Sequence, residues 1–121
     1  MTGSRDQAVA AARAAADKKA RDIVVLDVRE LIVITDYFVI ATATSDRQVR
    51  TVADGIEEAL RPLGVKPVRR EGVREGQWVL LDFVDFVAHV FRDEERSYYE
   101  LERLWADAPG VDWEARAASS I

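Results

Sequence analysis

Two short apolar stretches follow one another closely in the second half of the chain, and their spacing limits how this region folds. Residues 78–82 read Trp-Val-Leu-Leu-Asp, and residues 86–91 read Phe-Val-Ala-His-Val-Phe. Runs of this length, rich in β-branched and aromatic residues, are typical of strands within a sheet. Because only a few residues separate them, we expect an antiparallel hairpin. Its two-residue turn is predicted at Phe83 and Val84, flanked by two aspartates.

Alternation along this hairpin divides its side chains between two faces. In the register set by that turn, Trp78 lies opposite His89 and Leu80 lies opposite Val87. One face is uniformly apolar and is assigned to the core: Val79, Leu81, Phe86, Ala88 and Val90. The other mixes large amphipathic groups with a carboxylate, as suits a surface offered in part to a partner: Trp78, Leu80, Asp82, Val87, His89 and Phe91. The turn lacks the Gly or Asn that tight hairpins prefer, and a one-residue slip would exchange the faces.

The other strands and helices predict a single sheet flanked by helices. The apolar run 31–34 either extends a strand or forms a buried connection. Further strands are predicted at 23–28, 37–42 and, at a sheet edge, 67–71. Helices are predicted at 5–21, 45–63 and 93–106. This order of strands and helices indicates an α/β domain with one mixed sheet of about five strands.

Two predicted helix starts carry the same signal. Ser4 followed by Gln7, and Ser45 followed by Gln48, match the capping box, in which two side chains satisfy free backbone amides. Apolar residues at helical spacing follow Ser45, as expected of a helix that packs on a core. The first helix is rich in alanine, which buries little area, so we expect it to be anchored less firmly.

The composition fits one acidic domain. The 121 residues suit a single domain over 1–107, with 108–121 as a flexible C-terminal tail. A net charge of -5 disfavours nucleic-acid binding by the chain as a whole, and the absence of cysteine excludes a disulfide framework. Because the sequence contains neither a long apolar stretch nor an apolar signal core, we expect a cytoplasmic protein without membrane contact.

The residues that would carry catalysis are missing. His89 is the only histidine, and its place inside an apolar strand favours a hydrogen-bonded structural role. The glycines form no phosphate-binding loop. Asp27, Asp82 and Asp85 do not form the closely spaced carboxylate pair that two-metal chemistry needs on a strand. We therefore expect no catalytic residue, no metal site and no cofactor.

Charge is distributed unevenly along the chain. Residues 61–74 hold five basic residues against one acid, a net charge of +4, and residues 93–107 hold six acids against two arginines, a net charge of -4. One interpretation is two ordinary solvated faces. The other is an acidic, aromatic surface that meets a basic partner, with the basic segment lying near nucleic acid or pairing with the acidic one in a dimer.

Several collinear motifs resemble the ribosomal silencing factor (Iojap-like) family over about residues 8–107. They include Ile34-Thr-Asp-Tyr-Phe-Val-Ile-Ala-Thr42 and Thr44-Ser45 with Arg47-Gln48-Val49. Downstream, the motifs are Gly76-Gln-Trp-Val-Leu-Leu-Asp82, His89-Val-Phe91 and Tyr98-Tyr-Glu-Leu-Glu-Arg-Leu-Trp105. The sequence departs from the family at Ala43 and Val84, where glycine is common. It is also unusually apolar at 31–33, which would suit a dimer or strand-exchange surface.

The resemblance implies a nucleotidyltransferase-like α/β fold without the catalytic acids of that superfamily. It also implies binding to a basic ribosomal protein, the fourteenth of the large-subunit set, at the subunit interface. Occupation of that surface blocks joining of the small subunit and represses translation when nutrients are scarce or in stationary phase. The family is also associated with ribosome biogenesis, and its members are often homodimers when free.

We expect the partner-binding surface to combine one face of the hairpin with the last helix: Trp78, Leu80, Asp82, His89, Phe91, Glu95, Tyr99 and Glu102. Ribosomal RNA contact is expected through Arg69, Arg70 and Arg74. If this assignment holds, Trp78→Ala weakens binding and leaves the fold intact. The alternative function is a nucleotidyltransferase-type enzyme acting on a nucleotide or RNA, with Ser45 at a helix start where phosphate binds.

Overall fold

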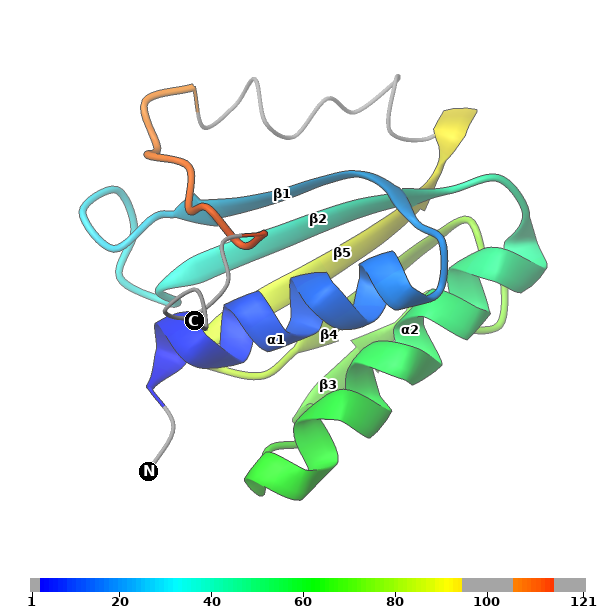
Figure 1. The fold of residues 1–121 in the computed structure, drawn as a ribbon, viewed down its shortest axis with the longest axis horizontal. Helices are drawn as coiled ribbons and strands as arrows, with labels where there is room; N and C mark the ends of the chain where they lie inside the picture. The colour runs from blue at the N-terminus through cyan, green and yellow to red at the C-terminus, as the bar shows by residue number, and fades with distance from the viewer. Residues whose placement is uncertain (1–2, 95–105, 115–121) are drawn as a thin grey trace.

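The computed structural model describes residues 3–94 and 106–114 and consists of a twisted sheet with two helices packed across it (Figure 1). The elements, in chain order, are α1 (Ser4–Asp17), β1 (Arg21–Asp27), β2 (Tyr37–Ala43), α2 (Asp46–Leu60), the 3₁₀ turn η1 (Arg61–Leu63), β3 (Arg69–Glu71), β4 (Trp78–Asp82) and β5 (Phe86–Arg92). The helix predicted at 93–106 lies almost wholly outside the described residues.

The five strands form one mixed sheet in the order β1-β2-β5-β4-β3. The central pair, β2 and β5, is parallel, and all other neighbours are antiparallel. Parallel neighbours require a long crossover, which here passes through α2, β3 and β4. The predicted α/β class with a single mixed sheet of about five strands is therefore confirmed.

Both described helices cover the same face of the sheet (Figure 1). The strand side chains beneath them are apolar and almost fully buried, and they include the set that was assigned to the core: Val79, Leu81, Phe86, Ala88 and Val90. The alanines of α1 are also buried, because their small side chains let the helix lie close to the sheet. The expectation of a weakly anchored first helix finds no support in this packing. Four alanines of α1 are fully buried: Ala8, Ala11, Ala12 and Ala15.

The hairpin turn lies one residue later than predicted. Val84 and Asp85 form its tip, and the Phe83 amide donates to the Phe86 carbonyl oxygen at 2.9 Å. The rings of Phe83 and Phe86 stack with centroids 4.6 Å apart and are buried, so Phe83 pairs with Phe86 below the tip and is not part of it. The predicted register is wrong by two residues, but a two-residue shift preserves alternation, and the predicted faces remain.

Only one of the two predicted capping boxes forms. Ser45 accepts a hydrogen bond from the Gln48 amide at 3.0 Å and caps α2, while the Gln48 side chain accepts from the Thr44 amide at 2.8 Å. Gly3 occupies the N-cap of α1 without a side-chain bond. Ser4 instead donates to Asp36 at 2.9 Å, which ties the start of α1 to the loop before β2.

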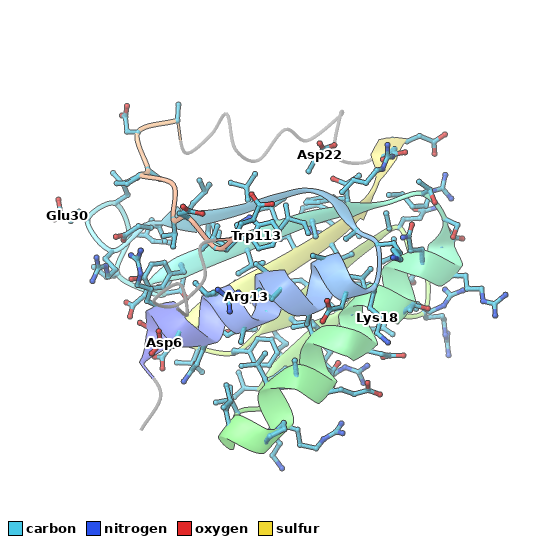
Figure 2. All side chains as sticks on the ribbon, viewed as in Figure 1. Asp6, Arg13, Lys18, Asp22, Glu30 and Trp113 are labelled. Carbon is cyan, nitrogen blue, oxygen red and sulfur yellow. The ribbon has the colours of Figure 1, made fainter. Side chains whose placement is uncertain are left out.

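Two connecting segments differ from the expectations. The run 31–34 is an exposed loop, with Val33 fully and Ile34 largely exposed, so neither predicted alternative for it is correct. Residues 109–113, assigned to the tail, lie along β1: the Asp27 amide donates to Pro109 and the Val111 amide to Val25, each at 2.8 Å. Figure 2 shows Trp113 over this region near Arg13, whose side chain donates to the Trp113 carbonyl oxygen at 3.1 Å. The ordered domain therefore extends past residue 107.

Candidate partner-binding surface

The five predicted sheet residues lie together on the face opposite α1 and α2. We call this set, Trp78, Leu80, Asp82, His89 and Phe91, the aromatic face. Trp78 pairs with Phe91 and Leu80 pairs with His89 across the two strands. Alternation along β4 and β5 places all five side chains on the same side, because the core residues occupy the positions between them.

Ring contacts hold the aromatic face in one arrangement. The Trp78 and Phe91 rings lie 4.8 Å apart between centroids, and the His89 and Phe91 rings are stacked at 6.1 Å. Phe38 from β2 meets His89 edge-on at 5.4 Å. Offset and edge-on pairs of this kind stabilise beyond the area that they bury. Phe38 was not among the predicted residues of this surface, because its place beside His89 depends on the pairing of β2 with β5.

His89 has the structural role that the sequence predicts. Its Nδ1 accepts a hydrogen bond from the Trp78 indole Nε1 at 3.2 Å. The side chain is 7% exposed, and this burial lowers the pKa of His89 from its ordinary value of 6.5 to about 4. The imidazole is therefore neutral at pH 7, and it orients the indole ring.

Exposure is graded across the aromatic face. Phe91 and His89, on the central strand β5, are buried. Trp78, Leu80 and Asp82, on β4, are only partly buried. The β4 side chains are therefore the more accessible part of the aromatic face, and the buried β5 side chains pack beside them.

Asp82 carries the negative charge of the aromatic face. One carboxylate oxygen accepts the Val84 amide at 2.8 Å, and the other lies 3.8 Å from the Arg69 guanidinium. Arg69 also pairs with Glu71 at 3.1 Å. These ion pairs are largely exposed, so each contributes little to stability and is open to competition from a partner's charges.

The three predicted RNA-contacting arginines lie at the β3 edge of the sheet and in the loop that follows. Arg69 and Arg70 belong to β3, and Arg74 follows in the loop; all three are exposed. Arg70 reaches Glu57 of α2 at 2.8 Å, and Arg50 donates to the Arg74 carbonyl oxygen at 3.1 Å. The structure therefore places Arg69 beside the aromatic face, while Arg70 points toward α2 on the other face of the sheet. Glu95, Tyr99 and Glu102 lie outside the described residues.

The described part of the chain offers little to a metal or phosphate. It contains no group of three or more His, Cys, Asp or Glu side chains arranged to hold a metal ion. The Ser45 hydroxyl, considered for phosphate, accepts the amide of Gln48 at the start of α2. Asp27 pairs with Arg29 at 2.7 Å. None of the helices in residues 3–94 and 106–114 is long and apolar enough to cross a membrane.

Comparison with known proteins places the chain among close relatives. A family model described as "Ribosomal silencing factor during starvation" matches residues 2–120. A ribosomal silencing factor of Bacillus subtilis is 45% identical over 102 residues, covering 84% of this chain and 86% of that protein. One from Halalkalibacterium halodurans is 40% identical over 104 residues, covering 86% and 89%.

A solved structure shares the fold as well as the sequence. The crystal structure of a Chromobacterium violaceum protein superposes with a TM-score of 0.84 at 35% identity and covers 87% of this chain and 88% of that one. The family match spans nearly the whole sequence, and the relatives align over most of their own lengths. The chain belongs to the ribosomal silencing factor family, whose members are ribosome-binding regulators of translation and not enzymes.

Proposed function

We propose that this chain docks on the large ribosomal subunit through the aromatic face and represses translation by occupying the surface that the small subunit needs. Its direct partner is a basic ribosomal protein of the subunit interface, the fourteenth of the large-subunit set, and repression belongs to nutrient limitation or stationary phase. One observation carries the proposal: Trp78, Leu80 and Asp82 remain partly exposed on the sheet face opposite both described helices.

The aromatic face is suited to bind a protein with little loss of side-chain freedom. The hydrogen bond from Trp78 to His89 and the ring of Phe91 already fix the indole, so docking does not have to order it. Trp78 and Leu80 supply apolar anchors, and Asp82 supplies a carboxylate for a partner's Lys or Arg. Glu95, Tyr99 and Glu102 remain predicted contacts of the same surface.

Ribosomal RNA contact is proposed for Arg69, Arg70 and Arg74. Because Arg69 lies against Asp82, docking through the aromatic face brings its guanidinium group to the side of the partner, whereas Arg70 reaches that side only if it leaves Glu57 of α2. Contacts of this kind bind phosphate without reading sequence and weaken with salt. This local role is compatible with the net charge of -5, since residues 61–74 carry a net charge of +4.

The free chain is proposed to form a homodimer through the aromatic face. The half-exposed Trp78 and Leu80 are apolar side chains that a second copy could cover. On this proposal, ribosome binding and self-association compete for one surface. Light scattering of the free protein, with and without Leu80→Ser, measures the dimer and its dependence on this face.

Co-sedimentation with purified large subunits, followed by a subunit-joining assay, tests the proposed function. Leu80→Ser should weaken binding about tenfold and restore joining of the small subunit. The matched control is Glu58→Gln, on the exposed side of α2 at the other face of the sheet, which should behave like the wild type. Normal sedimentation of Leu80→Ser, or normal joining with bound wild-type protein, would contradict the proposal.

The alternative function, a nucleotidyltransferase-type enzyme, is set aside, because the family consists of regulators that are not enzymes. On this proposal the docked domain acts on the ribosome by steric exclusion of the small subunit. Repression should accordingly depend on the fraction of large subunits occupied and require no nucleotide.

A further inference from the structure

A second exposed surface lies at one end of the sheet and meets the aromatic face only at Asp82, whose carboxylate accepts the Val84 amide. Val33 is 99% exposed, Ile34 78%, Val84 53% and Leu31 42%. We call these four residues the apolar tip. The loop and the hairpin turn that carry them are adjacent, because the Asp36 amide donates to the Asp85 carbonyl oxygen at 3.0 Å. Both lie at the end of the sheet where α1 begins (Figure 1).

Val84 occupies this position in an unfavourable backbone conformation. Its φ of 76° lies in the left-handed region, which β-branched residues adopt rarely and glycine adopts freely. Glycine at position 84 would therefore form this turn without backbone strain. Instead an aliphatic side chain stands exposed there, next to the loop that exposes Val33 and Ile34. Backbone strain of this kind is concentrated at functional sites.

The charges around the apolar tip are mainly negative. The charged residues at this end of the described structure include seven acids and three bases: Asp6, Asp27, Glu30, Asp36, Asp82, Asp85 and Asp107 against Arg5, Arg29 and Arg69. Figure 2 shows Asp6 and Glu30 at this end of the molecule. Arg29 is already paired with Asp27 at 2.7 Å. A nucleic acid is repelled by such a rim, and a second copy would bring like charges together, whereas a basic protein segment is attracted.

A hollow beside the apolar tip has matching chemistry. It measures about 180 Å³ and is lined by Asp27, Glu30, Leu31, Asp107 and Pro109. Leu31 and Pro109 offer an apolar wall to the methylene stem of a long basic side chain, and Glu30 and Asp107 offer carboxylates to its charged end. Leu31 belongs to both surfaces, so the hollow is continuous with the apolar tip.

We propose that the apolar tip docks a basic protein segment, with an aliphatic side chain of the partner against Val33, Ile34 and Val84 and a Lys or Arg in the hollow. The inference rests on the proposed function in one respect: the segment is carried by a protein of the large ribosomal subunit. It adds a second contact at the end of the sheet, adjoining the aromatic face at Asp82.

The test is sedimentation with purified large subunits, in which the dissociation constant is measured over a range of NaCl concentrations. Val33→Ser with Ile34→Ser should weaken binding about tenfold. Its control is Val68→Ser, another largely exposed aliphatic residue (69%) before β3, which should stay within twofold of the wild type. Glu30→Lys should weaken binding and flatten its salt dependence, whereas Glu58→Lys on α2 should not.

The possible results separate this inference from the proposed function. If Leu80→Ser loses binding and the Val33→Ser, Ile34→Ser variant binds like the wild type, the aromatic face stands and the apolar tip is overturned. If the wild type itself fails to sediment with large subunits, both proposals fail. If the double variant only turns a dimer into a monomer in light scattering, the occupant is a second copy, and the docking of a basic segment is overturned.

Discussion

The indole Nε1 of Trp78 donates to Nδ1 of His89 at 3.2 Å, which joins a half-exposed side chain to a buried one. The bond requires the neutral form of the imidazole, because protonated His89 has no acceptor at that nitrogen. The geometry of the candidate binding surface thus depends on the protonation state of one buried group.

Folding stability should fall as the pH is lowered from about 6.5 to about 4. Burial lowers the pKa of folded His89 to about 4, while the unfolded chain titrates near 6.5. Between these values the unfolded state binds more protons, so acid favours unfolding by about 3 kcal/mol in total, at ~1.4 kcal/mol per pH unit. Above pH 6.5 this contribution to stability is fully present.

Urea unfolding of the wild type and His89→Asn between pH 7.5 and pH 4 measures this effect. Asn offers an amide oxygen to the Trp78 indole but does not titrate, and His89 is the only histidine. The difference in unfolding free energy between the two proteins should therefore narrow in acid. A constant difference would show that His89 is not responsible.

Trp78→Ala should destabilise the fold by about 2–4 kcal/mol, contrary to the sequence-based expectation that the fold stays intact. The variant loses the ring contact with Phe91 at 4.8 Å and leaves the buried Nδ1 of His89 without its indole donor. Trp78→Phe keeps an aromatic ring and should cost about 1–2 kcal/mol. Equal stability of Trp78→Ala and wild type in urea would mean that the indole has only a binding role.

The parts of the structure that alternation controls were predictable, and those that depend on distant contacts were not. Both faces of the hairpin are as predicted, although the turn was placed one residue too early. Its true position depends on the stacking of Phe83 on Phe86, which strand propensity does not describe. The positions of Ile34 and Val111 likewise depend on the folded sheet. Ile34 lies in an exposed loop, and Val111 pairs with the free edge of β1 through the Val25 carbonyl oxygen.

The candidate site shows the same division. Strand alternation was enough to assemble the aromatic face, and a lone histidine in an apolar strand was enough to predict a structural role. The separation into buried β5 residues and half-exposed β4 residues was not predictable, because it depends on the parallel pairing of β2 with β5. That pairing places Phe38 against His89 from a strand about fifty residues earlier.

Gly72→Ala should destabilise the fold by at least about 3 kcal/mol and disturb the aromatic face. Gly72 has a φ of 79°, and an added Cβ would lie 2.0 Å from the Trp78 carbonyl oxygen, so the start of β4 would have to move. The matched control is Gly64→Ala, which has a φ of 77° and no atom within 4 Å of the added carbon. It should cost only about 1 kcal/mol. Similar losses for the two variants in urea unfolding would argue against the clash.

Val84→Gly should stabilise the fold by about 0.5–1 kcal/mol, although glycine usually destabilises. The variant relieves the strain of a β-branched residue at a φ of 76° and gives up little burial, since Val84 is 53% exposed. The bond from the residue 84 amide to the Asp82 carboxylate survives, because it does not involve the side chain of residue 84. Val68→Gly is the control: Val68 is similarly exposed but lies outside the left-handed region, so it should lose about 0.5–1 kcal/mol. If urea unfolding shows both variants less stable than the wild type, Val84 is not strained. If Val84→Gly gains stability and loses affinity for large subunits, the strained side chain is retained for binding at the apolar tip.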